Sequence, residues 1–174
     1  MARIVYKEGL EGQNRLECIE GIEIDLLNGQ KALIYPKYAV RQMLSPEQID
    51  KWDAKELTEI RALKVENTAK DTRELLSIGS PAAEWVNQFH SDEHDTKFYL
   101  PSLLAAMEIQ DQELDIDGLA KTIEGADLLR FFTNCIWSCF RQGENNGWSV
   151  YGYSGYINYG SLYGSHLAVP IILL

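Results

Sequence analysis

Alternation of apolar and acidic side chains predicts a β-hairpin near the start of the chain. Residues 22–26 read Ile-Glu-Ile-Asp-Leu, so their apolar side chains would share one face of a strand. Asn28 and Gly29 follow, and a second apolar run occupies residues 31–35. Asn-Gly between two such runs is typical of a type I′ turn, which needs a positive φ at both central residues. We therefore expect a hairpin within residues 16–36, with residues 2–6 as a candidate third strand.

Helical periodicity dominates the middle of the chain. Ser45, Ser80 and Ser102 each precede apolar residues at helical spacing, where a serine hydroxyl can cap the first turn. Proline follows two of these serines directly and suits the first helical position. We expect helices over residues 45–65, 81–89 and 103–110, and a fourth over 118–129 that Asp117 caps. Residues 64–77 either continue the first helix or loop away, and residues 97–100 form a short strand after a polar loop.

From residue 131 onward the hydrophobic period changes to two. The segments 131–140, 148–160 and 166–173 have the composition of strands, and a Gly/Asn turn separates the first two. This pattern predicts a terminal set of antiparallel strands. Helices packed beside hairpins give an α+β fold, and 174 residues are enough for a single domain with its own core.

The composition of residues 143–174 differs from that of the rest of the chain. This segment holds five of the nine tyrosines and a single charged residue, whereas 24% of the whole chain is charged. Tyr, Ser, Asn and Gly are the residues that antibody-type binding surfaces use, because rigid rings combine there with small hydrogen-bonding groups. In a strand that begins at Trp148, this ring would belong to the core, while Ser149, Tyr151 and Tyr153 would share the exposed face. The segment therefore predicts a contact surface on the terminal hairpins.

Charge and targeting signals narrow the classes of partner. The net charge is −10 and the basic residues form no stripe, which disfavours nucleic acid and anionic membranes as partners. The first 12 residues lack the apolar region of a signal peptide, and no apolar stretch has the length of a membrane span. We therefore expect a cytoplasmic or phage-particle-associated protein. The three cysteines are odd in number and are expected to be reduced core residues.

Three groups of side chains are candidates for other chemistry. His90 and His94 could share a metal if they lay on a helix, and Cys139 with His166 could form a nucleophile and base on neighbouring strands. A hydrolase that uses Cys139 or His90/His94 is therefore an alternative hypothesis. The acids of the segment from Asp111 to Asp117 leave a weak calcium site open, although the spacing of a calcium-binding loop is not met. Our first expectation is a protein without catalytic residues, metal or cofactor.

Several segments, in their order along the chain, resemble a known family. Phe98 to Ser102 followed by a helix resembles the W-R-L-P-T/S junction of bacterial C-type-lectin-like domains of the Lcl C-terminal-domain type. Residues 136–138, 145–150 and 168–171 resemble the ending Y-W-S-S, A-W-x-V and V-R-P-V of that family. The resemblance implies a single C-type-lectin-like domain with an N-terminal β-hairpin, helices in the middle and a C-terminal antiparallel hairpin set. Residues 41–78 would be a helical insertion.

The family also implies a function and a set of contact residues. Its members include surface adhesins and the variable proteins of diversity-generating retroelements, some of them carried by phages. In the variable proteins, Tyr, Asn and Ser positions in the final hairpins are the ones that vary. Matching positions here are Asn145, Asn146, Ser149, Tyr151, Tyr153, Ser154, Tyr156, Asn158, Tyr159, Ser161 and Tyr163, with Trp137, Trp148 and Pro170 at scaffold positions.

Some positions depart from the family pattern. Ala105 stands where the family often has a Glu that completes a capping box, and Val169 stands where it has an Arg. The acid-Pro-acid motif of calcium-dependent sugar binding is missing, because Leu100 and Ser102 flank Pro101. The resemblance therefore implies a fold without implying a sugar ligand.

The sequence as a whole favours a non-enzymatic binding protein. Its terminal hairpins would present a Tyr/Ser/Asn/Gly surface to a protein or cell-surface ligand, in the manner of an adhesin or of a phage or retroelement variable protein. The alternative to a binding module is a structural subunit of a phage-like or surface assembly. In that alternative, the same tract is a subunit interface and the chain forms a homo-oligomer.

Overall fold

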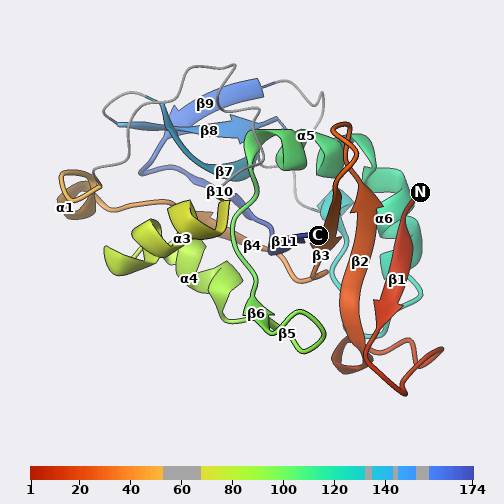
Figure 1. Cartoon of the computed structure of the whole chain (residues 1–174). Helices are drawn as coiled ribbons and strands as arrows, with labels where there is room; N and C mark the ends of the chain where they lie inside the picture. Colours follow the sequence, from red (N-terminus) through yellow and green to blue (C-terminus); the bar gives the residue numbers. More distant parts are fainter. Residues whose placement is uncertain (53–67, 132–134, 143–144, 152–156) are drawn as a thin grey trace.

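Two large β-sheets, a small two-stranded sheet and the helices packed on them make up most of the chain that the structure describes. The computed structural model describes residues 1–52, 68–131, 135–142, 145–151 and 157–174. Within these ranges, a four-stranded sheet has the order β1-β2-β3-β11 and a five-stranded sheet has the order β4-β10-β7-β8-β9. In Figure 1 the first sheet lies on the right and the second at the upper left, with helix α5 between them. The α+β class expected from the sequence is confirmed.

The first sheet contains the expected hairpin. Strand β2 (Ile19–Asp25) pairs antiparallel with β3 (Lys31–Ile34) and with β1 (Arg3–Tyr6), and β11 (Ile171–Leu173) pairs with β3. The expected type I′ turn is wrong, because Gly29 has a φ of 84° and Asn28 does not have a positive φ. The Leu26 amide donates to the Gln30 carbonyl at 2.8 Å, so the loop is longer than two residues and ends in a left-handed glycine.

The second sheet combines distant parts of the chain. Strands β7 (Ile136–Gln142), β8 (Asn146–Val150) and β9 (Ile157–Ser161) pair antiparallel, as the period of two predicts. Strand β10 (Ser165–Ala168) departs from that expectation, because it runs parallel to β7 and antiparallel to β4 (Ala39–Gln42). After β10 the chain leaves this sheet and β11 joins the first one, so the last ten residues connect the two sheets.

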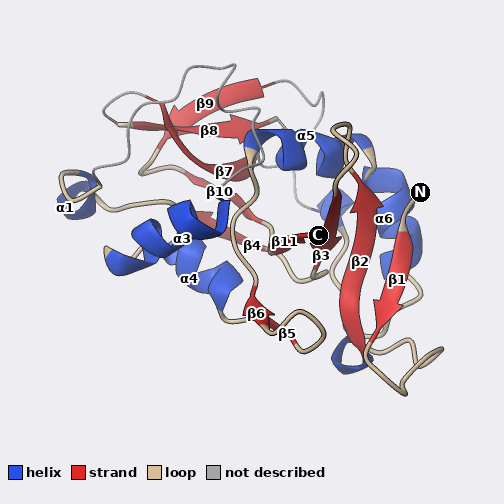
Figure 2. Cartoon of the chain, viewed as in Figure 1, coloured by secondary structure: helices blue, strands red, loops and turns tan. Residues whose placement is uncertain are grey.

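Three of the described helices, α1, α4 and α5, begin at the expected serine caps. Ser80 and Ser102 accept hydrogen bonds from the amides of Ala83 and Ala105, and Ser45 forms a capping box with Gln48. The described helices are α1 (Pro46–Ile49), α3 (Thr68–Ser77), α4 (Pro81–Asn87), α5 (Leu103–Asp111) and α6 (Glu113–Ala120). Figure 2 shows α3 and α4 below the second sheet. Short 3-10 turns lie at Leu16–Cys18 and Leu129–Phe131, and β5 (His90–Ser91) pairs with β6 (Thr96–Lys97).

One helix expectation lies partly outside the described residues, and another needs correction. Helix α1 ends at Ile49, and residues 53–65 of the expected first helix lie outside the described residues. The fourth helix covers residues 113–120 instead of 118–129, so Asp117 lies within it and does not cap it. The Asp117 side chain is 2% exposed and accepts hydrogen bonds from the amides of Leu129 and Arg130 at 2.7 and 3.1 Å. Its carboxylate therefore holds the segment that follows the helix.

One apolar cluster extends through both sheets. Phe98, Leu100 and Leu103 are fully buried, as are Ile22 in the first sheet and Trp137 in the second. Helix α5 packs on β7 and β8, α6 packs on β2, and α4 packs on β4 and β10. The three cysteines are free and buried, as expected. The helical insertion expected over residues 41–78 stays a prediction, as does the lectin-like identity of the fold.

A buried carboxylate connects the three N-terminal strands. Glu23, whose side chain is 7% exposed, accepts hydrogen bonds from Arg3 Nε and Nη2 at 3.0 and 2.9 Å and from Lys31 Nζ at 2.6 Å. The Arg3 hydrogen bonds, followed by those from Lys31, lower the pKa of Glu23 from 4.5 to about 2 against the opposing effect of burial. The charged form of Glu23 is therefore the form that the fold favours.

We expect Glu23→Gln to lower the free energy of unfolding near neutral pH by about 1–2 kcal/mol, because it removes the negative charge that accepts the hydrogen bonds of Arg3 and Lys31. The loss is no larger because solvent around Arg3 and Lys31 weakens these ion pairs. The pKa of Glu23 is lower in the fold than in the unfolded chain, so this stabilisation is present above pH 4.5 and is lost as the pH falls towards 2. Urea unfolding at several pH values measures the difference. Glu11→Gln, at an exposed position, is the control. A difference that stays constant down to the lowest pH would contradict this assignment.

Candidate binding surface

A buried tryptophan fills the inner face of the second sheet. Trp137 is fully buried, its Nε1 donates to the Arg41 carbonyl at 2.9 Å, and its ring centre lies 4.3 Å from that of His166. Trp137 faces Ser149 across β7 and β8. A Cβ at the neighbouring Gly147 would lie 3.1 Å from Cζ3 of Trp137. The inner face of β8 therefore has room only for small residues.

The inner face of β9 is restricted in the same way. Gly160 pairs with Gly147 across β8 and β9. A Cβ at Gly160 would lie 2.5 Å from Nε2 of His166, a separation that carbon and nitrogen atoms do not tolerate. Trp137 and His166 occupy this space, and the large rings of β8 and β9, Trp148 and Tyr159, lie on the opposite face, which they share with the buried Val150.

The outer face carries the large rings. Trp148 pairs with Tyr159 across the strands, with ring centres 6.1 Å apart and ring planes at 87°. This edge-to-face arrangement is a favourable one for aromatic pairs. Asn146 pairs with Ser161 on the same face. Tyr159 is 55% exposed, whereas Trp148 is half-buried beside it and supports its ring.

Tyr163 and Asn145 extend this face at one end. The Tyr163 hydroxyl lies 3.4 Å from Oδ1 of Asn145, and the Leu162 amide donates to the Asn145 carbonyl at 2.9 Å. Tyr163 is 40% exposed. We use the name tyrosine surface for the set Asn145, Asn146, Trp148, Tyr159, Ser161 and Tyr163. Tyr151, which is 43% exposed, follows β8 directly.

The structure divides the predicted contact residues. It brings together Asn145, Asn146, Tyr159, Ser161 and Tyr163, whereas Tyr153, Ser154 and Tyr156 lie outside the described residues.

Two of the predicted contact residues do not face the tyrosine surface. The expectation that Ser149 is exposed is wrong, because it is fully buried opposite Trp137. Asn158 is exposed but pairs with Ser149 on the other face, where its Nδ2 lies 4.0 Å from Sγ of Cys135. Trp148 was expected in the core, and its place beside Tyr159 was missed. Gly147 marks the inner face and could have given the correct alternation.

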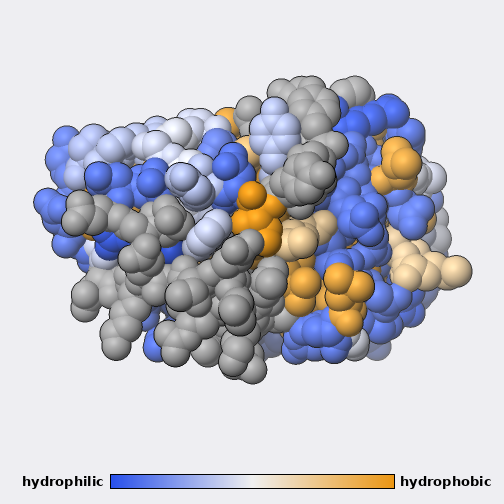
Figure 3. All heavy atoms as spheres, turned by 90° about the horizontal axis from the view of Figure 1, so that it is seen from above, coloured by the Kyte–Doolittle hydropathy of each residue, from blue (hydrophilic) through white to orange (hydrophobic). Residues whose placement is uncertain are grey.

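Within the described residues, the exposed aromatic side chains lie near the C-terminal end of the chain. Among the described residues, the exposed rings are those of Tyr151, Tyr159 and Tyr163, while Tyr38 and Tyr99 are buried. No Asp, Glu, Lys or Arg occurs from residue 145 to residue 174. Figure 3 looks onto the side of the molecule that carries β8 and β9, where much of the surface at the upper left is pale, whereas the right side is mostly deep blue with some orange patches. The surface is therefore aromatic and polar but without formal charge.

The histidine and acid clusters serve the fold. His90 lies on β5, with Nδ1 at 3.3 Å from Asp92 and Nε2 at 3.6 Å from Asp95. Within the described ranges, no three His, Cys, Asp or Glu side chains are arranged to hold a metal ion. The acids of residues 111–117 lie on helices α5 and α6 and not in a loop, and Asp117 is turned into the core.

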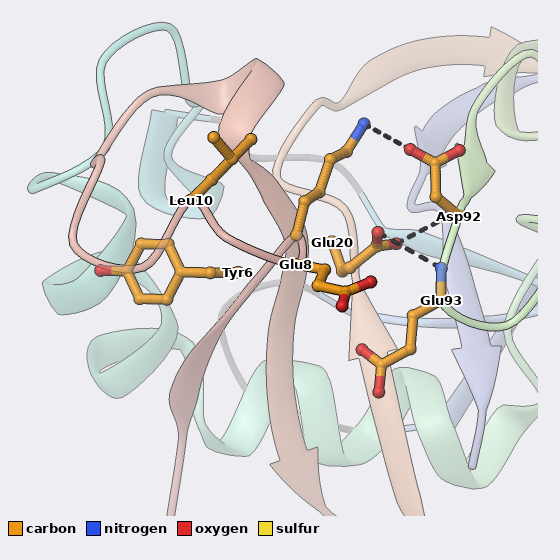
Figure 4. A pocket seen from close by; sticks show the side chains of 7 residues that line it. Tyr6, Glu8, Leu10, Glu20, Asp92 and Glu93 are labelled. Atoms are coloured by element: carbon orange, nitrogen blue, oxygen red, sulfur yellow. Dashed lines mark hydrogen bonds and ion pairs between the residues drawn. The ribbon is translucent and has the colours of Figure 1, made fainter.

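A cavity of about 770 Å³ lies between β1, β2 and the β5–β6 turn (Figure 4). Glu20 is 2% exposed at its wall and accepts hydrogen bonds from Ser91 Oγ at 2.6 Å and from the Asp92 amide at 3.0 Å. Lys7 Nζ lies 3.0 Å from Asp92 Oδ2. These groups connect the turn to the first sheet. The residues that line the cavity are Tyr6, Lys7, Glu8, Leu10, Glu20, Asp92 and Glu93.

Cys139 lies in an environment unlike that of a nucleophile. Its side chain is 1% exposed, and its Sγ lies 4.0 Å from Oδ2 of Asp71. Burial, and secondly the Asp71 carboxylate, raise the pKa of the Cys139 thiol, while burial raises the pKa of Asp71 to about 6. A reactive cysteine needs a lowered pKa and access. The described contacts of His166 are with Trp137 and Gly160, not with Cys139.

Comparisons of the chain with protein-family models, with curated proteins and with solved structures find no match. The resemblance to C-type-lectin-like domains therefore stays a prediction. None of the described helices has the length and apolar character needed to cross a membrane.

We expect Cys139 to resist alkylation in the native protein at about pH 8, because burial keeps the thiol protonated and inaccessible. Iodoacetamide treatment followed by peptide mass spectrometry measures the modification at each of the three cysteines. The same protein in denaturant is the control, where all three should react. Rapid modification of Cys139 in the native protein would contradict the buried environment and support the hydrolase alternative.

Proposed function

We propose that this protein is a non-enzymatic binding protein whose tyrosine surface contacts a protein or cell-surface ligand. The observation that supports the proposal best is the distribution of its rings. In the part of the chain that the structure describes, the exposed aromatic side chains all belong to tyrosines of residues 151–163. Exposed aromatic groups gathered on one uncharged face are typical of an interaction site.

The geometry of the tyrosine surface lets a ligand bind with little loss of side-chain entropy. A tyrosine side chain has only two χ angles, so few rotamers are lost when it is held in a complex. Trp148 packs edge-on against Tyr159 and restricts that ring before any ligand arrives. The amides of Asn145 and Asn146 and the hydroxyl of Ser161 supply donors and acceptors around the rings. Rigid anchors surrounded by small polar groups can bind a ligand without catalytic chemistry.

The charge distribution supports contact through this same face. The chain carries a net charge of −10, yet residues 145–174 contribute no formal charge. Contact there avoids the cost of removing water from ionised groups. The ligand is therefore expected to be recognised by shape, aromatic contact and neutral hydrogen bonds. Assignment to the adhesin or phage variable-protein type is part of the proposal and derives from the resemblance.

We expect the double variant Tyr159→Ser/Tyr163→Ser to keep its fold and to bind at least about 30-fold more weakly than the wild type, the size of a typical loss at an aromatic anchor. An array of cell-surface proteins and glycans identifies a ligand of the wild type, and surface plasmon resonance then gives its Kd for each variant. Near-ultraviolet circular dichroism confirms folding.

The matched control is Leu27→Ala/Leu114→Ala, which removes two exposed apolar side chains far from this face in the sequence. The control should bind as the wild type does. Equal binding by the tyrosine variant and the control would exclude the tyrosine surface as the binding site.

We expect the affinity to change less than about threefold when salt rises from about 50 to 500 mM, because charges screened by salt are absent from the contact face. Kd measurements over this range test the expectation. A steep loss of affinity with salt would show that the ligand instead contacts the acidic part of the molecule.

A further inference from the structure

His166 lies beneath the middle of β9 in a position that the binding function does not require. Its side chain is half-buried on β10, and its Nε2 is buried without a hydrogen-bond partner among the described residues. The ring contacts Trp137 on one side. On another side it approaches Gly160, where a Cβ would lie 2.5 Å from Nε2. Tyr159 and Ser161 flank that glycine in β9.

The surroundings of His166 offer no described counter-charge. Its cross-strand neighbour on β4 is Arg41, whose guanidinium lies 4.8 Å from the ring centre of Trp85. Helix α4 packs on β10, and its acidic residue Glu84 is exposed. The facing residues of β7 and β9, Trp137 and Gly160, carry no charge. A positive charge on the imidazole would therefore face no anion among these described neighbours.

We propose that His166 is an acid-sensitive switch that releases β9 and so dismantles the tyrosine surface at low pH. Protonation places an N–H on the buried Nε2, directed at the backbone of Gly160, where the described residues offer no acceptor. A buried charge without a partner is costly, so the imidazolium must reach water. Water reaches it when Gly160 moves away from the imidazole, and Tyr159 and Ser161 of β9 move with Gly160.

The direction of the pH effect follows from burial. Burial lowers the pKa of His166 below 6.5, and the hydrogen bond with the Ser165 backbone opposes this only in part. The native packing of Gly160 against His166 therefore favours the neutral ring. A state in which β9 has moved away from the ring binds the proton more readily. The stability that the neutral His166 ring contributes to this packing is fully present above pH 6.5 and is lost as the pH falls below that value. The effect on ligand binding rests on the proposed function, whereas the opening of β9 does not.

The first test uses the protein without ligand. Proton–carbon correlation spectra follow the three histidine rings from about pH 8 to about pH 4.5, and His166→Gln identifies the His166 signal and removes the titrating group. We expect the amide signals of Tyr159, Gly160 and Ser161 to shift together with the His166 ring, at a midpoint below 6.5, and to stay constant in His166→Gln. A His166 ring that titrates without any change at Gly160 would overturn the switch.

A second pair of variants keeps the test decisive if His166→Gln does not fold. Gly160→Ala should lower the melting temperature by at least about 3 °C, because its Cβ meets the imidazole, and a further His166→Ala should reverse most of that loss. Independent effects of the two substitutions would overturn the contact on which the switch depends.

The binding arm is separate. Affinity for the ligand found on the array should fall several-fold between about pH 7.5 and about pH 4.5 in the wild type, and stay nearly unchanged in His166→Gln. A failure of the tyrosine surface to bind at neutral pH contradicts the proposed function. The spectra of the ligand-free protein still test whether β9 opens in acid. Binding at neutral pH with the same loss in acid for both proteins contradicts the switch alone.

Discussion

The exclusion of bulk from the inner face of β8 and β9 determines where the rings of this protein point. Trp137 and His166 lie on that face, and a Cβ added at Gly147 or Gly160 beside them would come within 3.1 Å of Trp137 or 2.5 Å of His166. Close packing of this kind tolerates little change in volume. The large residues of the same strands, Trp148 and Tyr159, consequently lie on the outer face. A buried packing constraint thus creates the exposed aromatic surface.

Local signals in the sequence were sufficient for several elements. The Asn28-Gly29 hairpin and the helix starts at Ser45, Ser80 and Ser102 depend on neighbouring residues only, and all four are present. The type of turn at Gly29 differs because one residue, not two, has a positive φ. The pairing of β10 with β4 and of β11 with β3 joins residues more than 100 positions apart, which no local pattern reveals.

The alternation of the terminal strands was recognised, and Val150 lies in the core with Trp148 packed against it, but Ser149 on the opposite face of β8 is buried as well. A period of two separates Trp148 from Ser149 without saying which of them is inside, and hydrophobicity alone places the tryptophan inside. Gly147 and Gly160 carry the missing information, since a glycine in a strand often marks the close approach of another group. Of the predicted contact residues, Ser149 fails for this reason, whereas Tyr159, Ser161 and Tyr163 share the exposed end with Asn145.

Several buried acidic side chains have partners within the fold. Glu20 holds the β5–β6 turn, Asp117 holds the segment after α6, and Glu23 connects three strands. Cys139 is enclosed next to Asp71. Acidic groups that make these hydrogen bonds are satisfied within the fold and stabilise it. The tyrosine surface differs from them because its polar atoms and rings are largely exposed.

Chemical modification of the tyrosines tests the outward orientation of the rings most directly. Nitration with tetranitromethane, mapped by peptide mass spectrometry in the native protein, reports the access of solvent to each phenol ring. Tyr159 and Tyr163 should be modified first, while Tyr38 and Tyr99, which are 4% and 8% exposed, should react only after unfolding. Protection of Tyr159 and Tyr163 equal to that of Tyr38 would show that these rings are enclosed and would contradict a binding surface at this end of the chain.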